Sequence, residues 1–279
     1  MLGSGKLRDL AAAELRLITS LLTDTTHTLD AEERLYCLAA QAARLCGWLC
    51  YDSGLHAAAQ RYYLAALRAS AAADDALIGA YTLAFQAIQT YTVGNPQDAV
   101  GLMQTARAAL RRRSTPKTAA ILHAREARAL SKLNDPRRCY RALDAAFGSL
   151  TTGRDDEPTW CYCINDSEIR MLAGSCALDL GDPRRALEHV ATAQGAFDAD
   201  SFPGDAAIYL ARAAQAYLAL GDLDAAAALG TQALHCHTSV DSARGDQTLA
   251  SLHAKLARYG KIPTVREFLE QAPPPSTAS

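Results

Sequence analysis

Short polar turns interrupt this alanine-rich chain at regular intervals. Five of these turns share a signature, centred on Gly54, Gly94, Asn134, Gly181 and Gly221. Glycine and asparagine tolerate the left-handed conformation in which a helix ends, and most of the turns continue with an Asp or Asn N-cap and a proline at the first helical position. The pattern therefore predicts a series of helix-turn-helix hairpins.

The apolar and polar positions between the turns predict thirteen helices. We expect them near residues 6–22, 30–50, 56–71, 75–93, 96–112, 116–133, 136–149, 163–180, 183–197, 204–220, 223–238, 241–258 and 263–271. A polar run at 151–159, which includes Asp155, Asp156 and Glu157, predicts an exposed loop.

Small residues recur in fixed register with the five turns, which are 40, 40, 47 and 40 residues apart. Three columns, lying seven residues before each turn and five and twelve after it, contain fifteen residues, all of them small. They are Gly47, Ala87, Ala127, Gly174 and Ala214; Ala59, Ala99, Cys139, Ala186 and Ala226; Ala66, Ala106, Ala146, Ala193 and Ala233. Such columns indicate that two helices approach closely at the same points in every unit.

The columns resemble those of the tetratricopeptide repeat (TPR), although 40 residues exceed the ~34 that are usual for that repeat. The resemblance implies an all-α, right-handed α-solenoid of about five to six TPR-like hairpins with a C-terminal capping helix. We expect an N-terminal helix and linker at 1–28, the solenoid at 29–271 and a disordered Pro-rich tail at 272–279.

A more specific resemblance lies in residues 47–70, 122–130, 158–187 and 240–259. These stretches are similar to the C-terminal TPR sensor region of actinobacterial helix-turn-helix (XRE-type) transcriptional regulators. The resemblance implies a module that binds a ligand or peptide and dimerises, without the DNA-binding domain. A stand-alone scaffold for protein partners is the alternative.

Composition and charge narrow the range of possible binding partners. The formal charge is −2 with a pI near 6.4, so no overall basic field attracts nucleic acid, and direct binding to it is not expected. Polar residues, such as Arg212 and Gln215 within 206–220, interrupt the longest apolar stretches before they could cross a hydrocarbon core of ~30 Å, so no membrane association is expected. The eight cysteines are scattered, and we expect reduced thiols in a cytoplasmic protein.

The ligand is expected on the concave face, which the first helix of each TPR hairpin lines. Counting back from each turn, and adding the central polar and aromatic cluster, gives Arg44, Trp48, Tyr51, Tyr81, Ile88, Tyr91, Arg128, Trp160, Tyr162, Asn165, Glu168 and Gln215. Aromatic faces beside arginine suit an extended peptide, or a small amphipathic molecule with an anionic end. Alternatively, Trp48, Tyr51 and Tyr81 pack between hairpins, Trp160 packs the loop onto the solenoid, and Glu168 pairs with a neighbouring arginine.

The sequence gives less support for catalysis or metal binding than for ligand binding. Cys46 and Cys50, Cys161 and Cys163, and the cluster at 235–237 could form a zinc site only if distant parts of the array met, so buried thiols are favoured. His123 and Glu126 share a helix face, where an ion pair is favoured over acid–base chemistry. We expect no enzyme, metal or cofactor; an enzyme using the central polar cluster is a further alternative.

Overall fold

The computed structural model describes residues 4–151, 157–194, 203–238, 240 and 242–272. Within these ranges every regular element is a helix, as expected for an all-α, solenoid-like fold. The chain divides between residues 169 and 170 into two compact units, called here the N-terminal unit and the C-terminal unit. The expected tail from 273 onward and most of the loop at 151–159 lie outside the described residues.

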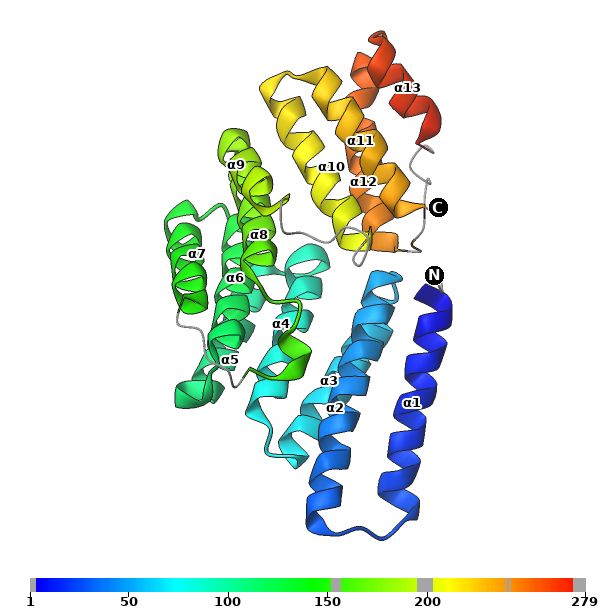
Figure 1. Cartoon of the computed structure of the whole chain (residues 1–279), viewed down its shortest axis with the longest axis vertical. Coiled ribbons are helices and arrows are strands. Elements are labelled where there is room, and N and C mark those ends of the chain that lie inside the picture. The colour runs from blue at the N-terminus through cyan, green and yellow to red at the C-terminus, as the bar shows by residue number, and fades with distance from the viewer. Residues whose placement is uncertain (1–3, 152–156, 195–202, 239, 241, 273–279) are drawn as a thin grey trace. The chain divides into compact units, whose positions relative to one another are not determined.

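The N-terminal unit contains three helical hairpins preceded by one helix (Figure 1). Its helices are α1 (Ser4–Asp24), α2 (Leu29–Asp52), α3 (His56–Ala72), α4 (Ala76–Val93), α5 (Pro96–Leu110), α6 (Pro116–Lys132) and α7 (Pro136–Leu150). Helices α2, α4 and α6 pair with α3, α5 and α7, and each first helix also contacts the first helix of the next hairpin. This contact pattern is that of stacked helical repeats.

The C-terminal unit continues the same pattern. Helix α8 (Asp166–Asp179) begins just before the division, and α9 (Pro183–Gln194), α10 (Pro203–Leu220), α11 (Leu223–His237), α12 (Ala243–Leu256) and α13 (Pro263–Gln271) follow it. Helices α10 and α11 form a hairpin, against which α12 and α13 pack. Phe268 of α13 is fully buried together with Leu252 and Leu256, so α13 covers the last hairpin as the expected cap.

The turns that end the first helices follow the prediction at four of five positions. Gly54, Asn134, Gly181 and Gly221 have φ between 54° and 84°. At each of them, paired backbone hydrogen bonds return to the preceding helix, as from Asn134 N to Ser131 O and from Asp135 N to Leu130 O. Gly94 differs, with φ −120°, because its amide donates to Thr90 O in the helical manner and no left-handed turn follows.

All fifteen residues of the three small columns are buried, which confirms the predicted close approach of paired helices. Gly47 illustrates the contact, because a Cβ atom built there would lie only 2.5 Å from a ring carbon of Tyr63. The columns therefore mark the seam of each hairpin, and side chains elsewhere on the first helices are left to form a surface.

Candidate functional site

A cluster of four aromatic rings around one arginine lies between the first two hairpins of the N-terminal unit. Arg44 and Trp48 stand one turn apart on α2, Tyr81 and Phe85 one turn apart on α4, and Trp160 lies in a short 3-10 helix, η2 (Thr159–Cys161). We call these five residues the Arg44 cluster. It joins predicted site residues that are more than one hundred positions apart in the sequence.

The rings of the Arg44 cluster contact one another at close range. Trp160 stacks on Tyr81 with ring centroids 4.5 Å apart, and Phe85 meets the rings of Tyr81 and Trp48 edge to face at 5.0 and 5.3 Å. The guanidinium carbon of Arg44 lies 4.9 Å from the centroid of Tyr81 and 4.8 Å from that of Phe85. These are cation–π distances, so the rings hold the side chain of Arg44 in place.

Arg44 is a cation without a counter-ion in the described part of the chain. Its Nε atom is buried and has no hydrogen-bond partner there, whereas the residue as a whole is only partly buried. Burial raises the pKa of the Tyr81 hydroxyl, as does the Cys163 thiol 3.5 Å away, so Tyr81 stays neutral and cannot neutralise Arg44. A partly accessible guanidinium in aromatic surroundings is suited to bind a carboxylate or phosphate.

Five predicted site residues are more buried than the count from the turns implied. Tyr51, Tyr81, Ile88, Tyr91 and Arg128 are each at most 6% exposed, so the expectation of an open inner face is wrong for them. The first helices of successive hairpins pack directly on one another, and these side chains fill the space between them. As the alternative interpretation proposed, Tyr51 and Tyr81 pack between hairpins.

Arg128 shows the consequence of this packing. Its guanidinium lies 5.7 Å from the ring centroid of Tyr91, and its Nη1 donates to Ser131 Oγ at 3.1 Å. The hydroxyl of Tyr51 lies 3.0 Å from Thr92 Oγ1. These polar groups are satisfied inside the unit, in contrast to Arg44.

The segment before α8, residues 157–165, contacts the start of α6 in the N-terminal unit. Glu157 Oε1 accepts a hydrogen bond from Lys117 N at the start of α6, and Asn165 Oδ1 accepts from Glu168 N at the start of α8. The carboxylate of Glu168 pairs with Arg125 at 3.6 Å, the ion pair that the structural alternative anticipated. Tyr162 is 69% exposed.

Gln215 belongs to the C-terminal unit, where its Oε1 lies 3.4 Å from Lys255 Nζ. The other eleven predicted site residues belong to the N-terminal unit. Phe85 was missed by counting from the turn, although its place four residues after Tyr81 puts it on the same helix face.

Most of the thiols are buried, and the predicted acid–base pair, His123 and Glu126, lies beside an arginine that pairs with Glu126. All eight cysteines are thiols outside disulfides, and five of them are buried; burial raises the pKa of Cys46 to about 11 and that of Cys161 to about 12. Glu126 is buried in an ion pair with Arg107, with His123 Nδ1 4.0 Å away. Across the described ranges, no three His, Cys, Asp or Glu residues gather as a metal site would require.

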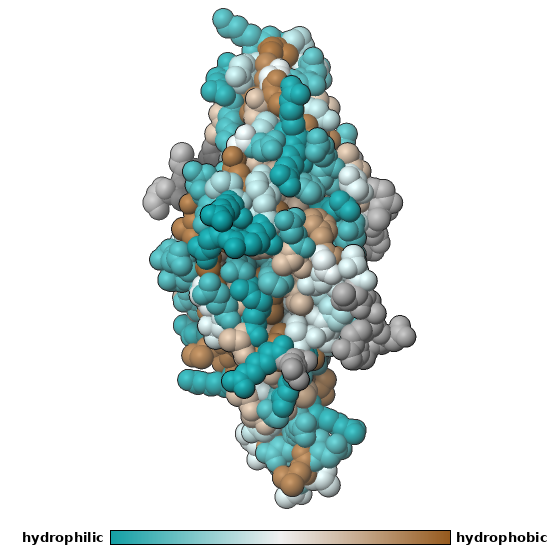
Figure 2. Space-filling model, turned by 90° about the vertical axis from the view of Figure 1, so that its left-hand side faces the viewer, coloured by the Kyte–Doolittle hydropathy of each residue, from teal (hydrophilic) through white to brown (hydrophobic). Residues whose placement is uncertain are grey.

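The described surface is mixed in polarity. On the face shown in Figure 2, hydrophilic side chains predominate and apolar residues are scattered among them in small patches. None of the described helices combines the length and apolar character needed to cross a bilayer.

Repeated hairpins, buried small columns and helix-only structure make this an all-α, helical-repeat protein. No protein-family model matches the sequence, and a search of curated proteins gives no match. Among solved structures, the chain is similar to the crystal structure of BtubC (BKLC) from P. vanneervenii, with a TM-score of 0.56. At 13% identity over 86% of this chain and 92% of that one, the likeness bears on the fold alone.

Proposed function

We propose that this chain is a TPR-like binding module that captures an extended peptide, or a small amphipathic molecule, by an anionic group. The ligand would lie over the Arg44 cluster, its apolar part against Trp48 and Trp160 and its anionic group on Arg44. The proposal also holds that the module is cytoplasmic and is related to the sensor regions of XRE-type regulators, as the sequence resemblance implies.

The observation that carries the proposal is the state of Arg44. Its guanidinium is held by two rings at 4.8 and 4.9 Å, and its Nε is buried without a hydrogen-bond partner in the described residues. A partly buried guanidinium without a counter-ion is unfavourable, and a carboxylate that met its accessible part would supply the missing charge. Arg125 shares the buried Nε without a hydrogen-bond partner, but its guanidinium pairs with Glu168, and Arg128 donates to Ser131, so Arg44 differs from both in having no polar partner among the described residues.

The proposed mechanism is a shift between conformations rather than a reaction. The Arg44 cluster draws side chains from α2, α4 and η2. A ligand that bridges them would favour the spacing at which all three contact it. Any partner surface sensitive to that spacing would then respond to the ligand.

A peptide library with free C-terminal carboxylates, screened beside the same library with amidated C-termini, tests the proposal. Bound sequences should carry a free carboxylate or an acidic side chain together with an apolar residue. Arg44→Gln should weaken their binding tenfold or more, since hydrogen bonds to charged groups contribute about 1.5–3 kcal/mol.

Arg34→Gln is the matched control. Arg34 lies on the same helix but is exposed and pairs only with Asp30, four residues earlier, in the described chain. Equal binding of both libraries, or equal affinity of the Arg44 and Arg34 variants, would remove Arg44 from the site. If the chain instead retains only folded protein partners from a cell extract, and Arg44→Gln does not affect them, it acts as a scaffold.

A further inference from the structure

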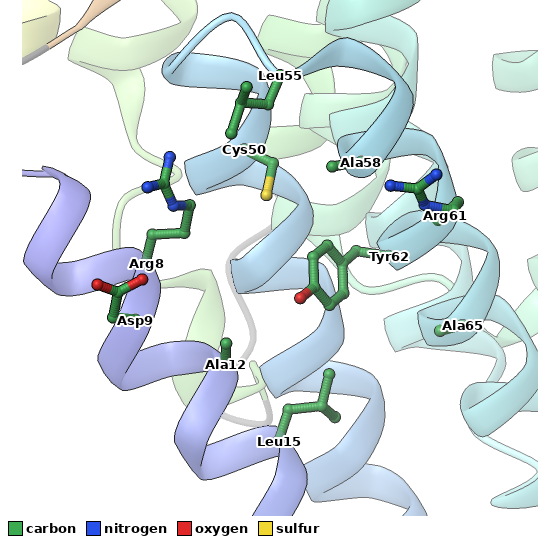
Figure 3. Close-up of a pocket in the computed structure, with 10 residues that line it drawn as sticks. All are labelled: Arg8, Asp9, Ala12, Leu15, Cys50, Leu55, Ala58, Arg61, Tyr62 and Ala65. Atoms are coloured by element: carbon green, nitrogen blue, oxygen red, sulfur yellow. The ribbon is translucent and has the colours of Figure 1, made fainter.

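A separate cavity lies at the other side of the N-terminal unit's first hairpin. It is open to solvent, has a volume of about 470 Å³ and is lined by α1, the end of α2 and α3 (Figure 3). Such a volume lies within the range of small-molecule sites. None of its lining residues belongs to the Arg44 cluster, and none is among the residues predicted from the sequence to bind a ligand.

The walls of the cavity carry cations. Arg8 projects from α1 and Arg61 from α3, and the buried thiol of Cys50 points into the space between these two helices (Figure 3). The charges of both arginines act on this thiol and lower its pKa, against the larger effect of burial, which raises it. Both positive charges therefore affect the thiol of Cys50.

These two cations have no partner in the described chain. Neither Arg8, which is half-buried, nor Arg61, which is exposed, makes a hydrogen bond or an ion pair with any described residue, and Asp9, the one carboxylate lining the cavity, is also exposed. The hydroxyl of Tyr62 points across the cavity toward α1 and supplies a further donor (Figure 3). Arg8 and Arg61 flank Cys50 from opposite sides, and the Tyr62 hydroxyl lies nearer Ala12, so the lining carries an excess of positive charge (Figure 3).

The rest of the lining is apolar. Leu55 and Leu15 lie at opposite ends of the cavity in Figure 3, and alanines of α1 and α3 form the walls between them. Alanine at these positions leaves the space open, since a longer side chain would occupy it. The cavity therefore combines a positively charged part with apolar walls.

From this geometry we infer a second binding site, for an amphipathic carboxylate: a monocarboxylate with an unbranched hydrocarbon chain. Its carboxylate lies at the end of the cavity that Arg8 and Arg61 flank, and its chain runs along the alanine walls past Tyr62 toward Leu15. Paired arginines suit the two oxygens of a carboxylate, and the apolar walls exclude ligands that are polar throughout.

Isothermal titration calorimetry with sodium decanoate, below its micelle concentration, tests the site on the full chain. We expect one decanoate per chain and at least tenfold weaker binding of 1-decanol, which has the same chain without the charge. The double variant Arg8→Gln/Arg61→Gln should bind decanoate at least tenfold more weakly. The control is Arg68→Gln, an exposed arginine on α3 outside the cavity, and it should bind as the parent does.

A second pair of variants tests the apolar walls. Ala58→Leu places a larger side chain in the cavity and should abolish binding, whereas Ala57→Leu, on the exposed side of the same turn, should not. Helicity from circular dichroism establishes that each variant is folded. Failure to bind decanoate, equal binding of 1-decanol, or equal affinity across both variant pairs would each overturn the inference.

The two proposed sites can be separated by one further variant. Arg44→Gln should leave decanoate binding unchanged, because Arg44 does not line this cavity. If Arg44→Gln abolishes decanoate binding while Arg8→Gln/Arg61→Gln does not, the carboxylate binds at the Arg44 cluster, and the second site is refuted.

Discussion

Gly47→Ala is expected to destabilise the N-terminal unit, although the sequence alone suggests the opposite. Equivalent positions in other hairpins hold alanine, as at Ala87 and Ala127, and alanine is the better helix former by about 1 kcal/mol. In the structure, however, the added methyl group would lie 2.5 and 2.6 Å from two ring carbons of Tyr63, which is fully buried.

The magnitude follows from these two opposing effects. Overpacking a buried site costs about 1–3 kcal/mol, because the ring must move within a filled core. Subtracting the gain in helix propensity leaves an expected net loss of about 1 kcal/mol. Gly148→Ala is the matched control: Gly148 lies on α7 with nothing within 4 Å of an added Cβ, so it should stabilise by about 0.5–1 kcal/mol.

Urea unfolding followed by tryptophan fluorescence gives the measurement. Trp48 and Trp160 are the only tryptophans of the chain, and both lie in the N-terminal unit, so the signal reports on this unit. Tyr63→Leu should reduce the cost of Gly47→Ala in a double-mutant cycle, because it removes the ring that the methyl group meets. If Gly47→Ala stabilises the unit as much as Gly148→Ala does, the argument from the Tyr63 contact is refuted.

Two further predictions concern titratable groups. At pH 8, a small disulfide reagent should modify only three thiols of the folded chain, the half-buried Cys37, Cys163 and Cys236, and all eight thiols in guanidinium chloride. The reason is that the other five are buried, and burial keeps thiols such as Cys46 (pKa about 11) and Cys161 (pKa about 12) protonated. Rapid modification of more than three thiols in the folded chain would contradict this. Burial, aided by the charge of Arg107, lowers the pKa of His123 below its ordinary 6.5, so the unfolded chain takes up the proton more readily. The stability of the N-terminal unit should therefore be complete above pH 6.5 and fall as the pH decreases through 6.5 toward the folded pKa. His123→Gln should flatten that slope in the fluorescence assay, whereas His189→Gln, in the C-terminal unit, should leave it unchanged.

The local features of the fold were predictable because short segments of the chain encode them. A left-handed residue followed by an N-cap, as at Asn134 and Asp135, determines where one helix ends and the next begins. The small columns were equally clear, since each recurs in every hairpin. The turn at Gly94 departs from the prediction: its residue types match those of the other turns, but its backbone hydrogen bonds do not.

The size of the residue facing each small column depends on the hairpin. Nine positions after the five turns lie Tyr63, Met103, Leu143, Val190 and Gly230. Gly47 faces the largest of these, Tyr63, whereas Gly230 leaves space that Phe268 of α13 fills, with its ring 2.9 Å from the position of an added Cβ. Repetition therefore predicted where helices meet, but not how much room each meeting leaves.

The candidate site was predictable only in part. Arg44, Trp48 and Tyr81 were found by counting along helices, and Trp160 was found in the central polar and aromatic cluster, but Phe85 was missed. Only the contacts of the Arg44 guanidinium with the rings of Tyr81 and Phe85 show it to be a confined cation. The cavity beside Arg8 and Arg61 gave no signal, because α1 shares no repeat with the helices that it contacts.

The sequence by itself determined the helices, their turns and the seams of the hairpins, because backbone hydrogen bonding and close approach depend on residues at fixed short spacings. The tertiary structure decided which side chains are buried, which arginines are left without partners and where space remains. Those properties depend on contacts between segments far apart in the chain, which no local pattern specifies.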